Sequence, residues 1–393
     1  MVSEARLVVE AGEHDRRLCP VSVCVPWDYD TPCARLKDAE TGRTVPCQLS
    51  RCGTGLALTF VVDSLPAGRS KTYLATPTGL SEACSPRSGV QVNDRVDDGC
   101  VDVIVNGSLF TAYHYGAQWV RPFLHPVVGP GGARVTRAWP IVEDVPGETH
   151  DHPHHKSMWV AYGDCDGVDN WSEEPGCGRQ VHREFIHLES GPVRGRICAR
   201  IDWCNNALRK QFEEIRDIKT YCLPGGVRLL DVSVSLHMTQ RAVTFRDTKE
   251  GGLLSVRVAT SMDAANGGRI QNGYGGINEE ETWGKSAPWC DYSGVVEGKQ
   301  VGIAVFDHDE NPRYPTGWHV RNYGLMTANC FAWSCYRPHV GERGDMRFAK
   351  GSTTTWRYRV YIHKGDARTG GVAARFLDFA APPKVHAYDG PEG

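Results

Sequence analysis

The run VRLLDVSVSLHM at residues 227–238 sets the expectation for the fold. In its second half, the apolar residues Val232, Val234 and Leu236 alternate with polar ones. Successive side chains of a strand point to opposite faces of a sheet, so this period of two predicts a β-strand with one apolar face. Such a strand needs a second layer against which that face is buried.

Seven more runs of β-branched and alternating residues lie along the chain, separated by Gly, Pro, Asp or Asn. They are residues 6–11, 21–26, 56–63, 101–107, 253–260, 301–307 and 356–364. Helical periodicity is scarce, and its best candidate is the short segment 370–380. With 43 Gly and 23 Pro to form turns, the sequence predicts an all-β protein.

We expect two domains, because 393 residues is long for one. Residues 1–85 predict a small N-terminal β-sandwich, and residues 86–393 predict a large antiparallel β-sandwich that carries the functional site. The segment 78–89 loses all periodicity and is typical of a linker.

Charge and hydropathy exclude two classes of partner. The formal net charge is −3, and no Lys/Arg cluster alternates with aromatic residues, so we expect no nucleic acid partner. No apolar stretch approaches the roughly 18 residues that a membrane span needs, so we expect no membrane partner either. The sequence does not indicate an oligomeric state.

The cysteines indicate the cellular compartment. There are 15 of them, an odd number with irregular spacing and no C-x-x-C pair. Reduced thiols are the simpler interpretation, and the N-terminus has no apolar segment of the kind that directs secretion. We therefore expect a cytoplasmic protein.

A histidine-rich segment, ETHDHPHHKSMWVAYGDCDG at residues 148–167, is the strongest chemical signal. If Pro153 begins a short helical turn, His152 and His155 converge. Imidazole is the commonest metal ligand, so we predict a divalent metal ion of unknown identity bound by His152, His155 and His182. The alternative is a polar loop whose imidazoles bind backbone and water.

Three other segments contribute polar and aromatic candidates for contact with a substrate. Trp119 offers a flat face of the kind that stacks on sugar rings, and several of the 11 tryptophans neighbour Arg or His. The predicted substrate-binding residues are Trp119, Lys249, Trp318, His319 and Arg321.

Four segments resemble those of the bacterial family labelled PmoA, or methane oxygenase PmoA. They are RPFLHPVVGPGG (121–132), DHPHHKSMWVAYGDCDGVDNWSE (151–173), DTKEGGLLSVRV (247–258) and NPRYPTGWHVRNYGLMTANCF (311–331). A methane monooxygenase subunit spans a membrane, so we carry over no activity from that label. A more distant similarity is to the galactose mutarotase-like β-sandwich, which implies histidines and a carboxylate in a sugar-binding groove.

The leading hypothesis is a carbohydrate-active enzyme with metal-assisted acid–base chemistry. Glu250 would abstract the proton α to a carbonyl, and His125 or His308 would protonate the departing oxygen. Arg121 and Arg321 would orient hydroxyls or stabilise negative charge. This chemistry fits elimination or hydrolysis of an oxidised (3-keto) glycoside by a lyase or hydrolase, and it also fits epimerisation.

Two alternatives remain open. One is a non-catalytic sugar-binding sandwich. The other is a non-haem iron oxygenase with a triad of His152, His182 and either Asp151 or Glu173. No G-x-G-x-x-G spacing supports a nucleotide cofactor.

Overall fold

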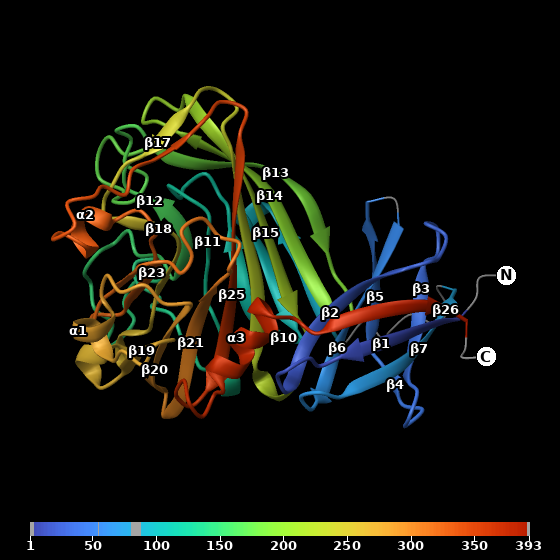
Figure 1. The fold of residues 1–393 in the computed structure, drawn as a ribbon. Helices are drawn as coiled ribbons and strands as arrows, with labels where there is room; N and C mark the ends of the chain where they lie inside the picture. Colours follow the sequence, from blue (N-terminus) through green and yellow to red (C-terminus); the bar gives the residue numbers. More distant parts are fainter. Residues whose placement is uncertain (1–3, 54, 80–87, 391–393) are drawn as a thin grey trace.

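Strands dominate the computed structural model, which describes residues 4–53, 55–79 and 88–390. Figure 1 shows a small lobe that contains the N-terminal part of the chain and a larger lobe beside it. Both lobes are built of antiparallel sheets, so the prediction of an all-β fold with a small and a large sandwich is confirmed. Residues 80–87 of the predicted linker lie outside the described residues.

The small sandwich consists of a five-stranded and a three-stranded sheet. Leu7, Leu58 and Tyr73 are among the side chains buried between them. The first sheet has the order β26 (Lys384–Asp389), β1 (Ala5–Glu10), β7 (Ser70–Thr78), β3 (Cys33–Asp38) and β4 (Thr44–Val45), and the second has the order β2 (Arg16–Val25), β6 (Gly55–Leu65) and β5 (Cys47–Cys52).

The last strand of the chain belongs to the small sandwich. β26 pairs antiparallel with β1, and Val385 lies opposite Val9. The predicted boundary at residue 86 assigned this strand to the large sandwich, because its local pattern does not reveal which sheet it joins. Residues near both ends of the chain therefore lie side by side in one sheet (Figure 1).

The large sandwich consists of two eight-stranded sheets. The first sheet has the order β22 (Trp318–Val320), β23 (Leu325–Ala328), β18 (Gly251–Arg257), β12 (Met158–Tyr162), β11 (Phe123–Leu124), β10 (Ser108–His114), β9 (Cys100–Val105) and β8 (Val90–Arg95). The second has the order β13 (Arg179–Glu189), β14 (Arg194–Cys204), β15 (Lys210–Tyr221), β16 (Arg228–His237), β25 (Thr353–Lys364), β21 (Lys299–Asp307), β20 (Trp289–Val296) and β19 (Arg269–Asn272). A separate ribbon joins β17 (Val243–Phe245) and β24 (Met346–Phe348).

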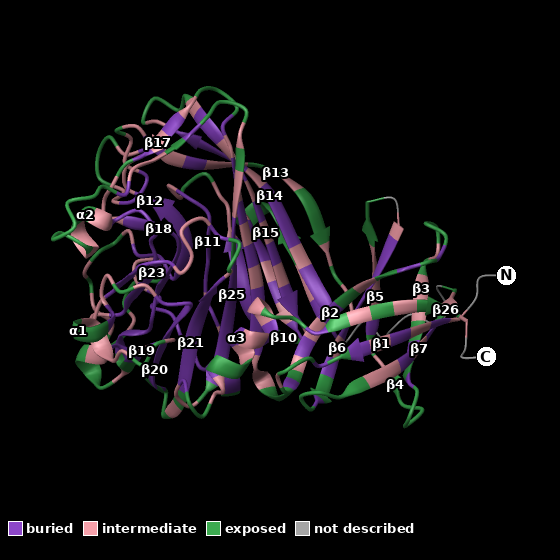
Figure 2. Cartoon of the chain, in the orientation of Figure 1, coloured by how far each residue is buried: buried purple, intermediate pink, exposed green. Residues whose placement is uncertain are grey.

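The core of the large sandwich lies between its two sheets, where Figure 2 shows long buried stretches of β21 and β25. The alternating run forms β16, as predicted, and turns Val232 and Val234 into this core. Burying each such side chain stabilises the fold by about 1.5–3 kcal/mol. On the opposite face of the same strand, Asp231 binds Arg359 at 2.6 Å.

Helices are few and short among the described residues. The predicted helix forms as α3 (Val372–Ala380), which buries Val372 and Phe376 and contacts β2, β21 and β25. Its Asp378 pairs with Arg16 of β2 at 3.4 Å, so α3 bridges the two sandwiches. The others are α1 (Asn278–Thr282), α2 (Trp333–Tyr336), and the 3-10 turns η2 (Val96–Asp98), η3 (Pro130–Gly132), η4 (Pro224–Gly226), η5 (Thr260–Met262) and η6 (Ala264–Asn266).

The face of the first sheet that points away from the core positions the candidate site. On β18, Val256 enters the core, so its neighbour Arg257 faces the other way. Trp159 of β12 lies on the same outer face. A smaller apolar cluster covers part of this face and consists of Phe123, Trp159, Ala161, Trp171 and Leu325.

Candidate functional site

The histidine-rich segment forms a tight turn over this face. The N–H of His155 donates to the carbonyl oxygen of His152 at 3.0 Å. The imidazoles of these two residues stack, with ring centroids 4.8 Å apart and planes 3° apart. The convergence expected around Pro153 therefore occurs. His152 itself has a left-handed φ of +46°, a conformation that costs an ordinary residue about 1 kcal/mol and must be held by its surroundings.

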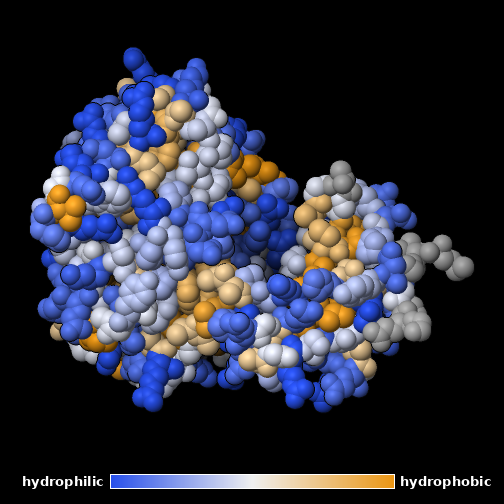
Figure 3. All heavy atoms as spheres, viewed as in Figure 1, coloured by the Kyte–Doolittle hydropathy of each residue, from blue (hydrophilic) through white to orange (hydrophobic). Residues whose placement is uncertain are grey.

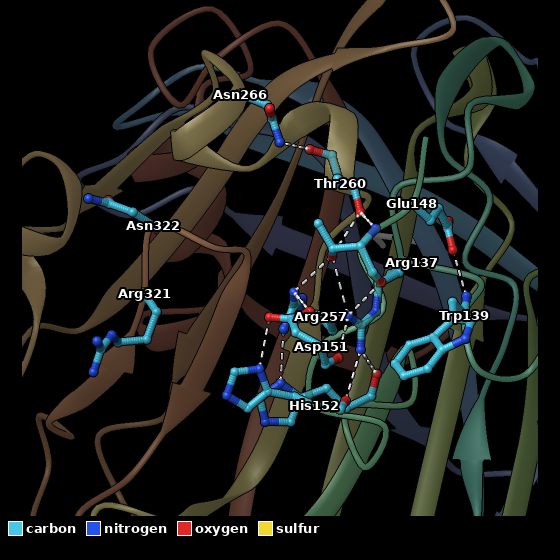
Figure 4. Close-up of polar contacts among 12 residues, drawn as sticks. Arg137, Trp139, Glu148, Asp151, His152, Arg257, Thr260, Asn266, Arg321 and Asn322 are labelled. Atoms are coloured by element: carbon cyan, nitrogen blue, oxygen red, sulfur yellow. Dashed lines mark hydrogen bonds and ion pairs between the residues drawn. The ribbon is translucent and has the colours of Figure 1, made fainter. Parts of the chain in front are cut away.

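Asp151 is the centre of the polar contacts (Figure 4). Its Oδ1 accepts hydrogen bonds from Arg137 and Arg257, both at 2.6 Å, and its Oδ2 lies 2.8 Å from Nδ1 of His152. Partial burial raises the pKa of Asp151, but Arg257, His152 and Arg137 together bring it down to about 2. The carboxylate is therefore ionised at neutral pH.

These contacts fix the tautomers of both stacked histidines. An ionised carboxylate can only accept, so Nδ1 of His152 donates to Asp151, and Nε2 of the neutral ring keeps a free lone pair. The His152 side chain is 40% exposed. A guanidinium can only donate, so Nδ1 of His155 accepts from Arg257 at 3.1 Å. Burial lowers the pKa of His155 well below its ordinary value, which keeps that ring neutral.

Arg137 also holds the backbone of the turn. Arg137 donates to the carbonyl oxygens of Asp151 and His152, at 2.8 and 2.9 Å. Burial, with the charge of Arg257, lowers the pKa of Arg137 to about 10, so it remains charged at neutral pH. Both guanidinium groups are almost fully buried, at 0% and 1% exposed. The position of the Asp151–His152 pair is therefore set by charge-assisted hydrogen bonds from Arg257 of β18 and from Arg137 in the loop before the turn.

Tyr323 joins this centre to a second group of predicted residues. Its ring stacks on His152 at 4.8 Å, and the guanidinium of Arg257 lies 4.8 Å from the ring centroid. Burial raises the pKa of Tyr323 to about 12, with smaller effects from four nearby charges. Those four charges are on Arg321, Arg257, Glu250 and Asp151.

On the Tyr323 side of the site, the guanidinium of Arg321 lies 5.6 Å from the centroid of the Tyr323 ring. Glu250 and Lys249 form an ion pair, and both side chains are partly exposed. His319 is buried beside them, and burial lowers its pKa to about 4 against the opposing charge of Glu250. Arg321 pairs with Glu279 at 2.8 Å and stands apart from the Asp151 carboxylate in Figure 4.

Arg121 and Trp119 lie on the other side of the histidine turn. Arg121 is buried, donates to the carbonyl oxygens of Trp171 at 2.7 Å and His154 at 3.3 Å, and pairs with Glu173 at 3.3 Å. A cavity of about 490 Å³ borders this group and includes Trp119, Arg121 and His182 in its wall. None of the predicted residues His152, His155 and Glu250 lies in the wall of this cavity.

The predicted metal site is not assembled. His182, on β13, packs against Tyr115 and Phe185, with ring centroids at 4.7 and 4.3 Å, and it makes no contact with the stacked pair. Nδ1 of His155 is occupied by Arg257. Throughout residues 4–53, 55–79 and 88–390, no three His, Cys, Asp or Glu side chains are grouped so as to hold a metal ion. The residues do not fit a three-histidine centre, and the same separation of His152 from His182 breaks the oxygenase triad.

Three further predicted residues lie elsewhere. Trp318 is fully buried in the core, and its indole N–H donates to the carbonyl oxygen of Ala287 at 2.9 Å, so it has no face free for a sugar. His308 follows β21 in the second sheet, where its ring contacts Phe379. His125 is buried, and burial lowers its pKa to about 3, which makes it a poor proton donor. Alternating strand patterns do not reveal which ends of different strands meet in space.

Three residues that support the site were missed by the sequence analysis: Arg137, Arg257 and Tyr323. Arg257 stands inside the apolar strand run 253–260, where an isolated charge needs a partner. That local conflict was the available signal. Nothing in the residues around Arg137 or Tyr323 marks them in the same way.

Comparisons with known proteins identify a family and distant structural likenesses. The sequence profile described as "Family of unknown function (DUF6807)" matches residues 100–377, more than half of the chain. No curated protein matches, and nothing found supports the label PmoA. Among the described residues, no helix is long and apolar enough to cross a membrane.

The similar solved structures share very little sequence. A protein in the glycosyl hydrolase family 38 from Enterococcus faecalis has 10% identity and a TM-score of 0.41, and the match covers 99% of this chain and 48% of that one. A GalM/aldose epimerase homologue from C. elegans has 10% identity and a TM-score of 0.29, with 71% and 99% covered. A galactose mutarotase-like protein from Clostridium acetobutylicum has 8% identity and a TM-score of 0.31, with 71% and 100% covered.

The chain spans about half the length of the glycosyl hydrolase. Because all three TM-scores lie below 0.5, we take no activity from these proteins.

Proposed function

The chain belongs to the family of unknown function DUF6807, and for this member we propose a carbohydrate-active enzyme in which His152 transfers a proton. The observation that carries the proposal is the contact between Oδ2 of Asp151 and Nδ1 of His152, which leaves Nε2 of a partly exposed imidazole as a free base. The sugar as substrate class is supported by the galactose mutarotase-like character of the sequence.

The reaction we propose is elimination of the aglycone from a 3-keto glycoside. Nε2 of His152 takes the proton from C2, α to the keto group, and the C–H electrons form the enolate. The enolate then expels the aglycone from C1, and the protonated His152 returns the same proton to the departing oxygen. Lys249 and Arg321, each already paired with a carboxylate of Glu250 or Glu279, lie on the Tyr323 side of this base.

We route no step of this scheme through a metal ion, because His182 lies apart from the stacked His152 and His155. In this scheme His152 protonates the departing oxygen, the role that the sequence analysis gave to His125 or His308. His125 lies beside His114 and His308 beside Phe379, and neither contacts Asp151. Glu250, the base predicted from the sequence, remains a candidate second base because its carboxylate is partly exposed.

The experiment compares p-nitrophenyl glycosides with their 3-keto forms and measures release of p-nitrophenol. We expect release from the keto form only, and at least a 100-fold loss in His152→Gln, within the range for general acid–base groups. His187→Gln is the matched control, because His187 lies on β13 beside Glu189 at 3.5 Å, away from the site. Equal rates in the two variants, or no release by the parent protein, would contradict the proposal.

The large cavity beside Trp119 favours a second candidate, a sugar-binding protein without catalysis. Its volume of about 490 Å³ lies within the range of small-molecule sites, and Trp119 supplies an aromatic wall. In that case calorimetry would detect glycoside binding that Trp119→Ala weakens and His152→Gln leaves unchanged, with no turnover of the keto form.

A further inference from the structure

A second cavity lies between the two sandwiches. Figure 3 shows a hydrophilic hollow between the large and small lobes. A cavity of about 290 Å³ there is formed by β2, β5 and β6 of the small sandwich and by β14 and β15 of the large one. It takes in none of the residues of the site around Asp151. Its wall consists of Pro20, Val21, Ser22, Ser50, Arg51, Cys52, Ala57, Thr59, Arg194, Arg196, Lys219 and Tyr221.

The charge of this wall is strongly one-sided. It contains the cations Arg51, Arg194, Arg196 and Lys219 but no carboxylate. Asp217, just outside, binds Arg196 at 2.8 Å and lies 3.7 Å from Lys219. Arg51 rests on the ring of Tyr29 at 4.4 Å, and no carboxylate of the described residues forms an ion pair with it. Positive charge concentrated between low-dielectric walls attracts anions.

Arg194 is the residue that most needs an anionic partner. Its side chain is only 8% exposed, yet its Nε atom is buried without a hydrogen-bond partner. Among the described residues, its guanidinium enters no recorded ion pair or hydrogen bond, and only its backbone N–H is engaged, by Gln48 at 3.0 Å. By contrast, Arg137 and Arg257, whose Nε atoms are likewise unpartnered, both bind Asp151 through their terminal nitrogens. An anion in the cavity can supply the partner that the buried Nε of Arg194 lacks.

We propose that this cavity binds a small molecule carrying a carboxylate or a phosphate, with Arg194 as its main partner. A guanidinium matches the geometry of either group through two parallel hydrogen bonds. Ser22 and Thr59 bring hydroxyl groups to the same wall for the rest of the ligand. The volume is close to the lower end of small-molecule sites, so a molecule of about monosaccharide size fits. The ligand would touch both sandwiches and so link them.

Calorimetry with four probes tests this proposal on the full chain: inorganic phosphate, glucuronate, glucose 6-phosphate and uncharged glucose, all at constant ionic strength. We expect at least one anionic probe to bind while glucose does not, and the preferred probe identifies the anionic group. Arg194→Gln should raise the Kd of the preferred anionic probe at least tenfold, which corresponds to a loss of about 1.4 kcal/mol in binding free energy. Failure of every anionic probe to bind would overturn the proposal.

Arg200→Gln is the matched control, because Arg200 lies on the same face of β14 but pairs with Glu184 at 2.9 Å and is not part of the cavity wall. The Kd of the anionic probe for Arg200→Gln should equal that for the parent protein. An equal loss of affinity in Arg200→Gln and Arg194→Gln would contradict a specific site. Arg51→Gln provides a second test that does not disturb the buried layer, since Arg51 is exposed. It should weaken binding several-fold, and unchanged binding in both Arg51→Gln and Arg194→Gln would place the anion elsewhere.

Discussion

Arg257 reaches Asp151 and His155 at the same time, through Nη2 at 2.6 Å and Nη1 at 3.1 Å. One guanidinium therefore holds an ionised acid and a neutral imidazole in fixed positions. The acid in turn holds His152, whose ring stacks on His155. A base positioned in this way has little freedom to rotate, which favours proton transfer at one defined point.

The first prediction concerns the orientation of His152. In Asp151→Asn the amide can donate to Nδ1 and favour the opposite tautomer, which removes the free base at Nε2. We expect kcat for aglycone release from a 3-keto glycoside to fall by about 100-fold or more. Asp309→Asn is the control, because Asp309 also lies beside a histidine, His308, at 3.0 Å. A similar fall in the control would mean that the effect is not specific to the site.

The second prediction concerns the stability provided by Arg257. Arg257→Met leaves the neighbouring Arg137 to hold Asp151 alone and removes the donor from Nδ1 of His155. Because Asp151 is 39% exposed and water can replace part of the interaction, we expect a loss of about 2 kcal/mol rather than the full effect of a buried pair.

Urea unfolding followed by circular dichroism would measure this loss. Arg343→Met is the control, since Arg343 pairs with Asp345 on the surface, and its loss should leave the free energy of unfolding nearly unchanged. An unchanged midpoint for Arg257→Met would show that the guanidinium does not hold the turn.

The third prediction is a pH effect far from the site. Burial raises the pKa of Asp307 to about 7, although Asn311 and the backbone N–H of Thr316 donate to its carboxyl group. Since the folded pKa lies above the ordinary value of 3.8, this residue favours folding most at pH values below about 4. That contribution is lost as the pH rises toward 7.

Asp307→Asn should therefore flatten the dependence of stability on pH between about 4 and 7 relative to the parent protein. Unfolding in urea at several pH values measures it. Parallel curves for the two proteins would show that the carboxyl group does not titrate in this window.

The fourth prediction separates core tryptophans from site tryptophans. Trp318→Phe removes the donor to the carbonyl oxygen of Ala287, so we expect a loss of about 1–3 kcal/mol in stability and no change in KM for a glycoside. Trp283→Phe is a suitable comparison, because its indole N–H has no hydrogen-bond partner in the described part of the chain. A raised KM for Trp318→Phe alone would restore the sugar-binding role predicted from the sequence.

The sequence predicted local structure well and long-range placement poorly. Alternation at residues 227–238 was sufficient to predict β16, and the periodicity at 370–380 was sufficient to predict α3. The proximity of His152 and His155 followed from Pro153, a local effect. The separation of His182 from this pair could not be predicted from the sequence. It depends on how β13 lies relative to the distant loop that contains His152 and His155.

The Arg194 cavity was equally invisible to sequence reasoning. Arg194 is the first residue of β14, a strand that contains two further arginines and carries no local signal of a binding site. Its place in a cavity wall becomes clear only when the small sandwich is seen beside it. Contacts between residues far apart in the sequence leave no periodic pattern in the residues around them.

The pairing of β26 with β1 sets an order of events on the ribosome. Residues 5–79 are synthesised first, but β1 remains an open edge until residues 384–389 emerge. An open edge can recruit a strand from another molecule. The small sandwich is therefore complete only after residues 384–389 have paired with β1, and a nascent chain stopped before residue 384 would leave the edge of β1 open to aggregation.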